Sequence, residues 1–261
     1  MFNQIRRRFH PLWRLRQMPW YRKLQDLVDP DVAIRMHGLK VYLKLLRDLS
    51  DILPHQGKES ATKEAFSSLL RCGNPVEVFF DVGANIGCYS WLAREHGVSD
   101  IFMFEPDRTN CRLLMRTLEA NRLEHVFVVP FAADSSATVS SFYLDRASGA
   151  TGSLVNQRLN PGSLHEAYGV GESHAVPTLP LDLFADFCRG KRLFIKIDVE
   201  GAEASVFAGA MELIRQTWPL IIVECFEPSR LEILHPLGYS IQSLDENSNF
   251  LLIPPGAVSL T

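Results

Sequence analysis

The chain has 261 residues, of which 46% are hydrophobic and 22% charged, a composition typical of an ordinary globular domain. No apolar run approaches the roughly 18 residues that a membrane-spanning helix requires. The five cysteines are scattered without a C-x-x-C pair, which argues against a disulfide framework or a zinc site and makes a reducing cytoplasm the simplest setting. The net charge of −3 hides an asymmetry: residues 1–25 carry seven basic side chains and no acid, so the remainder carries −10.

Residues 1–60 are predicted to form a basic N-terminal extension. Its arginines alternate with aromatic side chains such as Trp13 and Trp20, and prolines interrupt any apolar core that a signal peptide would need. We favour an arm packed over the domain. Peripheral contact of residues 1–25 with an anionic membrane is the alternative, and nucleic acid ranks last. Residues 33–44 alternate apolar and polar positions around His37-Gly38, which predicts a short hairpin.

Residues 61–261 are predicted to form one α/β domain. Apolar runs and helical stripes alternate along this part of the chain, which implies a mostly parallel sheet covered by helices on both faces. Strands are expected at residues 78–81, 101–104, 126–133, 193–197, 220–223, 239–244 and 250–253, and helices at 61–72, 88–96, 107–121, 202–214 and 229–235.

An insertion around residues 135–180 breaks this alternation. Residues 138–144 look like a strand, whereas residues 148–171 are rich in Gly, Ser and Asn. Such insertions are often binding loops or lids, and disorder is the alternative.

Three of the predicted strands end on acids, Asp81, Glu105 and Asp198. Because the carboxyl ends of parallel strands share one edge of a sheet, these acids mark a candidate ligand site. Glu105 stands where a carboxylate can accept hydrogen bonds from both ribose hydroxyls, of S-adenosylmethionine or of NAD alike. The loop from Gly83 to Gly87 places Asn85 where the dinucleotide pattern G-x-G-x-x-G has its middle glycine. This loop favours S-adenosylmethionine, because that cofactor has an ammonium and a carboxylate in place of a pyrophosphate.

The chain resembles the FkbM-type S-adenosylmethionine-dependent methyltransferases over residues 75–230, through motifs that occur in order at fitting intervals. These are FDVGANIG at residues 80–87, FEP at 104–106, PLD at 180–182, KIDVEGAE at 196–203 and IIVE at 221–224. The resemblance implies a Rossmann-like class I methyltransferase fold whose last two strands form a reversed hairpin. It also implies methyl transfer to a hydroxyl of a sugar, glycolipid or polyketide-like acceptor.

The resemblance also implies which residues hold the cofactor. The first loop would hold its methionine end, Glu105 its ribose, and three small residues its adenine. The loop residues are Asp81, Gly83, Ala84, Asn85 and Gly87, and the adenine residues are Pro106, Ala132 and Ala133. Asp198 would lie near the sulfonium or the acceptor.

A hydroxyl acceptor must lose its proton as the new bond forms, so a nearby base is expected. Asp198 and Glu200 are the main candidates, and His165 or His174 of the insertion are lesser ones. The stretch Asp198-Val199-Glu200-Gly201 lacks the Asn/Asp-Pro-Pro-aromatic motif common in methyltransferases that act on nucleobase or glutamine nitrogen, which favours oxygen. Glu203 is expected to cap a helix.

Other interpretations stay open at this point. Asp198 and Glu224 could share a divalent metal, but no dense ligand cluster accompanies them, and we predict no metal. An NAD(P)-dependent oxidoreductase lacks support from the first loop and from any Tyr-x-x-x-Lys pair. A catalytically silent cofactor-binding module at a membrane surface is the third reading. The sequence does not identify the acceptor or the oligomeric state.

Overall fold

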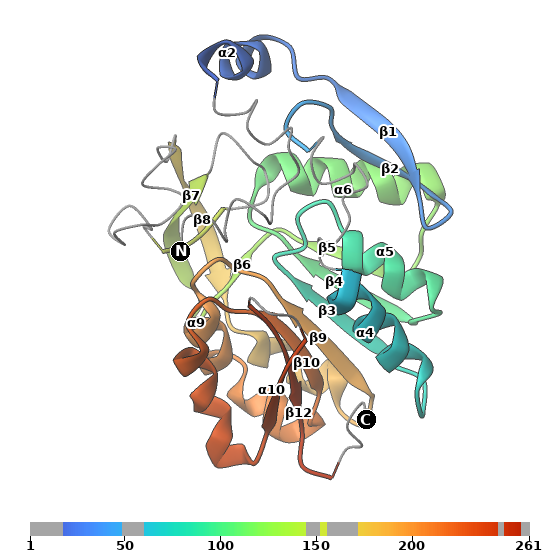
Figure 1. The fold of residues 1–261 in the computed structure, drawn as a ribbon, viewed down its shortest axis with the longest axis vertical. Coiled ribbons are helices and arrows are strands. Elements are labelled where there is room, and N and C mark those ends of the chain that lie inside the picture. The colour runs from blue at the N-terminus through green and yellow to red at the C-terminus, as the bar shows by residue number, and fades with distance from the viewer. Residues whose placement is uncertain (1–17, 49–59, 145–151, 156–171, 245–247, 257–261) are drawn as a thin grey trace.

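The computed structural model describes residues 18–48, 60–144, 152–155, 172–244 and 248–256 (Figure 1). At its centre is a seven-stranded sheet with the order β11-β12-β10-β9-β3-β4-β5. The strands are β3 (Val78–Val82), β4 (Asp100–Phe104), β5 (Val126–Val129), β9 (Leu193–Ile197), β10 (Leu220–Glu224), β11 (Ser240–Ser243) and β12 (Asn249–Ile253). β3 and β9 lie next to each other at the middle of the sheet and are buried along their whole length, as their continuous apolar runs predict.

The predicted C-terminal hairpin is present, with one refinement. β12 lies between β10 and β11 and is antiparallel to both. Only β12 is therefore reversed, and β11 runs in the same direction as β10. The remaining neighbours in the sheet are parallel, so the prediction of a mostly parallel α/β sheet is confirmed.

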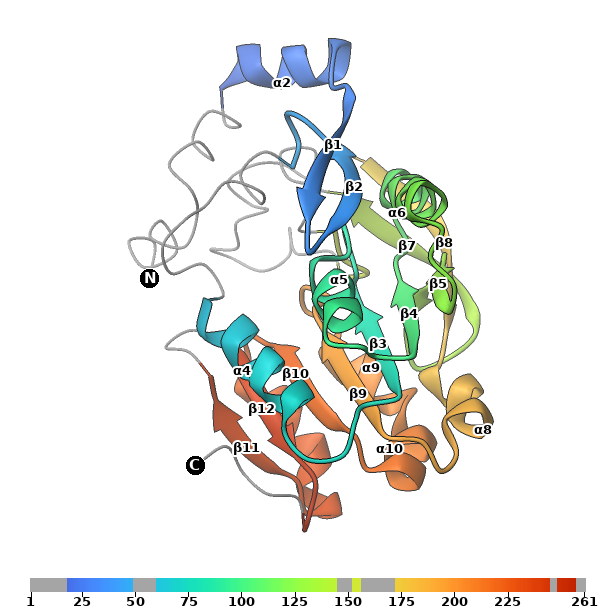
Figure 2. The same cartoon turned by 90° about the vertical axis from the view of Figure 1, so that its right-hand side faces the viewer.

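Helices cover both faces of the sheet, as predicted (Figure 2). One face carries α4 (Ser60–Arg71), α5 (Cys88–Glu95) and α6 (Arg108–Asn121), and the other carries η3 (Leu181–Phe184), α8 (Ala185–Cys188), α9 (Glu203–Ala208), α10 (Met211–Thr217) and η4 (Pro228–Leu237). Successive residues of a strand point to opposite faces. Phe79 therefore packs against Phe66 of α4, and Phe80 packs against Phe184 of η3.

Two helix predictions need correction. The helix expected over residues 202–214 is divided at Gly209 into α9 and α10. A Cβ at Gly209 would lie 2.1 Å from the carbonyl oxygen of Asp134, so this glycine permits close packing against the loop that follows β6. The segment expected as a helix over 229–235 is the 3-10 helix η4, which contains Pro236.

The two strands of the insertion join β6, just before it, in a second, three-stranded sheet with the order β6-β8-β7. Its strands are β6 (Ala132–Ala133), β7 (Thr138–Leu144) and β8 (Glu172–Leu179). The strand predicted at 138–144 is confirmed. The run predicted over 126–133 is divided into β5 and β6, because Pro130 interrupts it. Residues 145–151 and 156–171, with His165 and most of the candidate lid, lie outside the described residues.

The described part of the N-terminal extension consists of α2 (Pro19–Leu27) and the antiparallel pair β1 (Asp31–Met36) and β2 (Leu39–Lys44). The predicted hairpin is confirmed: both His37 and Gly38 have positive φ at its turn. The hairpin packs along α6, where the Tyr42 amide donates to Thr117 Oγ1 at 3.0 Å. Residues 1–17 and 49–59 lie outside the described residues, and the division into 1–60 and 61–261 stays a prediction. No helix within the described ranges has the length and apolarity to cross a membrane.

Candidate active site

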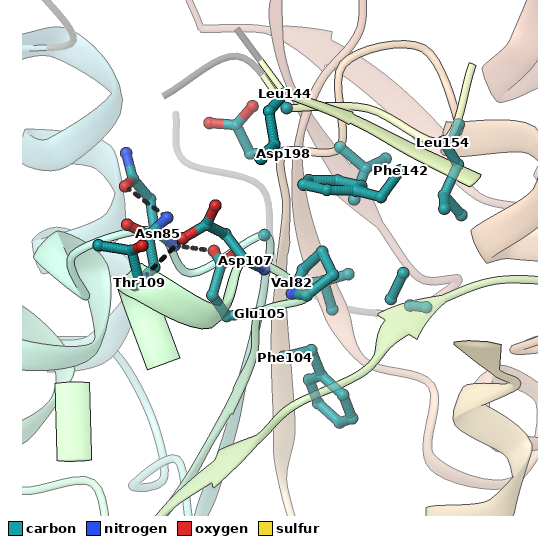
Figure 3. Close-up of a pocket in the computed structure, with 18 of the residues that line it drawn as sticks. Val82, Asn85, Phe104, Glu105, Asp107, Thr109, Phe142, Leu144, Leu154 and Asp198 are labelled. Carbon is teal, nitrogen blue, oxygen red and sulfur yellow. Dashed lines mark hydrogen bonds between the residues drawn. The ribbon is translucent and has the colours of Figure 1, made fainter. Parts of the chain in front are cut away.

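A cavity lies beyond the carboxyl ends of β3, β4 and β9 (Figure 3). Seven of the predicted site residues line it: Gly83, Asn85, Glu105, Pro106, Ala132, Ala133 and Asp198. The other lining residues are Arg47, Val82, Phe104, Asp107, Thr109, Asn110, Phe142, Leu144, Gly152, Leu154, Val199 and Ala202. The converging strand ends that the sequence predicts are therefore brought together at one edge of the sheet.

The loop after β3 is folded tightly by residues with left-handed backbone. Gly83 has φ 81° and Asn85 has φ 52°, a conformation that glycine and asparagine tolerate best. The amides of Gly83 and Ala84 both donate to the carbonyl of Phe104, at 2.9 and 3.1 Å. A Cβ at Gly83 would lie 1.9 Å from the carbonyl oxygen of Asp198. The glycine therefore lets the loops after β3 and β9 touch, which shapes the cavity.

Glu105 presents a buried carboxyl group to this cavity. Its Oε1 accepts a hydrogen bond from the Asp107 amide and its Oε2 one from the Asn85 amide, both at 2.7 Å. Burial raises the pKa of Glu105 to about 7, against the opposing effect of these hydrogen bonds. Each carboxylate oxygen can accept more than one hydrogen bond, so the group retains capacity for two neighbouring hydroxyls of a ligand.

A chain of polar side chains links the N-terminal hairpin to the first loop. Arg47 Nε donates to Asp48 at 2.7 Å and Nη2 donates to Asn110 Oδ1 at 2.5 Å. Asn110 Nδ2 in turn donates to Asn85 Oδ1 at 3.2 Å. Neither Arg47 nor Asn110 was predicted from the sequence. The pattern Asp107-x-x-Asn110 carries only a local signal, the N-cap of α6, where Asp107 Oδ1 accepts from the Asn110 amide.

Asp198 lies at the end of β9 and is partly exposed to the cavity, with 30% of its side-chain surface accessible. The Lys196 ammonium lies 3.4 Å from Asp198 Oδ2 and is almost fully buried. The same lysine stands opposite Asp81 in the register of β3 and β9. Lys196 thus opposes the effect of burial on the pKa of Asp81.

Asp81, Ala84 and Gly87 are not among the described residues that line the cavity. Asp81 Oδ2 accepts hydrogen bonds from the amide and the hydroxyl of Ser90, at 3.1 and 2.6 Å. Burial raises its pKa to about 6. The carboxyl group thus holds the first turn of α5, while Gly87 leaves room for the Trp91 ring, 2.6 Å from a Cβ built there. These three residues shape the loop, and their contact with a cofactor stays a prediction.

Glu200 also lies away from the lining of the cavity. Its backbone has φ 50°, and its carbonyl accepts a hydrogen bond from Ser153 Oγ at 2.7 Å. Its neighbours Val199 and Ala202 line the cavity, and a role of Glu200 as the base stays a prediction. Glu203 is in the first turn of α9, where its Oε1 accepts from the Gly201 amide at 2.7 Å, which agrees with the predicted capping role.

β7 and the segment around Leu154 supply an apolar wall. Phe142, Leu144 and Leu154 lie across the cavity from Asn85 and Thr109 in the view of Figure 3. The sequence indicated that the insertion helps to form a binding site, but not which of its residues do so. His174 is on β8 and is exposed.

Within the described ranges, no group of three or more His, Cys, Asp or Glu side chains could hold a metal ion. Glu224, which was considered as a partner of Asp198 in a metal site, has a different contact. Its Oε1 accepts a hydrogen bond from Ser248 Oγ at 3.1 Å.

Comparison with known proteins identifies a methyltransferase family for this chain. A family model described as the methyltransferase FkbM domain matches residues 81–241, which is more than half of the chain. No curated protein shows a significant sequence match.

Among solved structures, a methyltransferase FkbM from Methylobacillus flagellatus KT is 21% identical, with 68% of this chain and 43% of that chain covered and a TM-score of 0.45. A precorrin-6y C5,15-methyltransferase from Geobacter metallireducens GS-15 is 13% identical, with 77% and 92% covered and a TM-score of 0.41. A Pyrococcus abyssi tRNA (uracil-54, C5)-methyltransferase in complex with S-adenosyl-L-homocysteine is 9% identical, with 85% and 43% covered and a TM-score of 0.43. The chain spans less than half of the first and third of these, and all three likenesses are too distant to indicate an acceptor.

Proposed function

Because this chain belongs to the FkbM methyltransferase family, we propose that it transfers the methyl group of S-adenosylmethionine to a hydroxyl oxygen of a sugar, glycolipid or polyketide-like acceptor. One observation carries the proposal: Glu105 and Asp198, from the ends of β4 and β9, line a single cavity. Glu105 is suited to bind the ribose hydroxyls of the cofactor, and Asp198 is suited to accept the proton of an acceptor hydroxyl.

S-adenosylmethionine is the cofactor of this family, and it supplies an electrophilic methyl group on a sulfonium. The cavity residues fit it. The Glu105 carboxyl, fixed by two backbone amides, would accept hydrogen bonds from the two ribose hydroxyls. Pro106, Ala132 and Ala133 form a small apolar surface that would lie against the adenine, and Gly83 with Asn85 would hold the methionine end.

In this proposal the protein mainly aligns the reactants. Methyl transfer is an in-line displacement, so an acceptor oxygen must be held opposite the sulfur with water excluded. The apolar side chains Phe142 and Leu154 would exclude that water. The Asp198 carboxylate would accept the hydroxyl proton as the oxygen–methyl bond forms. Lys196, 3.4 Å away, would fix the orientation of this carboxylate.

Calorimetric titration tests the cofactor assignment. We expect S-adenosylhomocysteine to bind and NADH not to bind. We expect Glu105→Ala to weaken S-adenosylhomocysteine by about 1–3 kcal/mol through lost charged hydrogen bonds. Binding of NADH alone would favour the oxidoreductase alternative and contradict the proposal.

Transfer of a radiolabelled methyl group to glycan, lipid and metabolite extracts of a strain that lacks this protein tests the reaction. We expect label in alkali-stable methyl ethers and a loss of about 10²-fold or more in Asp198→Asn. Glu200→Gln, just outside the lining of the cavity, is the matched control and should stay near full activity. Cofactor binding without any transfer, unaltered in Asp198→Asn, would favour the silent module.

A further inference from the structure

Helix α2 exposes a stripe of large apolar side chains. Trp20, Leu24 and Leu27 are 54%, 41% and 81% exposed, and their spacing of four and three residues places them on one side of the helix. The adjacent side is anchored to the protein, since Tyr21 is buried and its hydroxyl donates to the Leu46 carbonyl at 2.9 Å. In both overall views α2 lies at the outer end of the molecule, beyond the hairpin (Figures 1 and 2).

The basic charge of the chain is concentrated in and just before α2 in the sequence. Five arginines lie within residues 1–17, and Arg22 and Lys23 follow in α2, whereas the first acid is Asp26. The rest of the chain carries −10. An apolar stripe alone would suit many partners. A short helix that has such a stripe with an exposed tryptophan, and that follows a strongly basic stretch of sequence, suits the interface of an anionic lipid bilayer.

Two sets of hydrogen bonds also connect α2 and the segment after it to residues at the cavity. Leu46, which binds Tyr21, is followed directly by Arg47, which lines the cavity. The Asp29 carboxylate, between α2 and β1, accepts hydrogen bonds from the amides of both Leu46 and Arg47, at 2.7 and 3.2 Å. A surface that α2 contacts therefore lies near the rim of the cavity.

We propose that the exposed stripe of α2, defined by Trp20, Leu24 and Leu27, docks on an anionic lipid bilayer and brings the cavity to the headgroup region. The choice of acceptor rests on the proposed function. Among the acceptor classes named above, docking selects a hydroxyl carried by a membrane lipid, such as that of a glycolipid headgroup. The docking itself is independent of methyl transfer.

Sedimentation of the full chain with vesicles tests the docking. We expect the protein to pellet with vesicles of equal phosphatidylcholine and phosphatidylglycerol and to stay in solution with phosphatidylcholine alone. Leu27→Glu should lower the affinity by about tenfold or more, because it places a charge in the stripe that the bilayer would bury. The matched control is Leu183→Glu, which makes the same change at another exposed leucine, 66% exposed on η3, and should leave binding unchanged.

Several results would overturn the docking. The intact protein could fail to pellet, or Leu27→Glu and Leu183→Glu could behave alike. Light scattering could show that Leu27→Glu converts a dimer to a monomer, in which case the stripe binds a second copy of the chain.

A separate methylation assay tests whether the acceptor is a membrane lipid. S-adenosylhomocysteine affinity should be equal in the intact protein and in Leu27→Glu, while methylation of a lipid extract presented in the anionic vesicles should fall by about tenfold in the variant. Equal rates would exclude a lipid-borne acceptor and leave the methyltransferase assignment intact. An absence of transfer by both proteins to every extract would instead count against the proposed function.

Discussion

Glu105 links the stability of the protein to pH. Its pKa rises from 4.5 to about 7 on folding, because burial penalises the charged form. Between those values the unfolded chain releases this proton while the native protein keeps it, so stability falls as the pH rises through that window. Glu105→Gln cannot titrate. We expect the loss of unfolding free energy between about pH 5 and pH 8 to shrink by about 1–3 kcal/mol in this variant, measured by denaturant melts.

Asp81 provides the comparison for this prediction. Its pKa is raised to about 6, so Asp81→Asn should flatten the profile mainly in the acidic half of the same window. If the slope above about pH 6 is the same in Glu105→Gln as in the parent protein, the buried carboxyl in the cavity is not its source.

Gly83 offers a test of the close approach between the loops after β3 and β9. A Cβ there would collide with the Asp198 carbonyl, and φ is 81°. Gly97 has nearly the same φ, 82°, with open space around it. Gly97→Ala should therefore cost only the backbone strain, about 1 kcal/mol, whereas Gly83→Ala should cost about 3 kcal/mol or more and abolish S-adenosylhomocysteine binding. Thermal melts and calorimetry measure the two effects, and equal costs would show that the loops do not need this contact.

At the scale of elements, the N-terminal hairpin is part of the cavity because it packs along α6. Asp31 of β1 pairs with Arg112 and Arg116 of α6. Hydrogen bonds from Arg112 and Lys44 hold the pKa of its carboxyl well below the usual range. The hairpin is thereby fixed to α6, and the turn that follows β2 places Arg47 at the cavity. The extension thus does more than cover the domain.

Arg47→Gln tests this contribution. The change removes the donor that orients Asn110, which in turn holds Asn85. It also removes the cation that lies 2.7 Å from Asp48 and 3.9 Å from Asp107. We expect S-adenosylhomocysteine to bind more weakly by about 1–2 kcal/mol, measured by calorimetry near neutral pH. The matched control is Arg35→Gln on the exposed side of β1, which should bind like the parent protein. Equal affinities in the two variants would mean that the hairpin packs beside the cavity but does not contribute to cofactor binding.

At the scale of the whole molecule, the features that the sequence predicted correctly are those that depend on a local pattern of residues. Apolar runs that end on acids predicted β3, β4 and β9 and the edge at which Glu105 and Asp198 meet, because periodicity and strand direction are local properties. It did not predict β8, whose Pro177 and exposed polar residues are untypical of a strand. Nor did it predict Arg47, whose position depends on packing between segments more than 60 residues apart, as its contact with Asn110 shows.

The assembly of the cavity from distant segments leads to a last prediction. Its described lining residues lie in the segments around Arg47, Asn85, Glu105 and Asp198, and in or beside the second sheet. A ligand that bridges these segments should suppress their local opening. S-adenosylhomocysteine should therefore slow amide hydrogen exchange in all four at once, measured by mass spectrometry of peptides. η4 and β11, which do not line the cavity, are the internal control. Protection confined to the groove between α6 and β8, lined by Arg108, Arg112 and Pro177, would place the ligand there and contradict the assignment of the cavity.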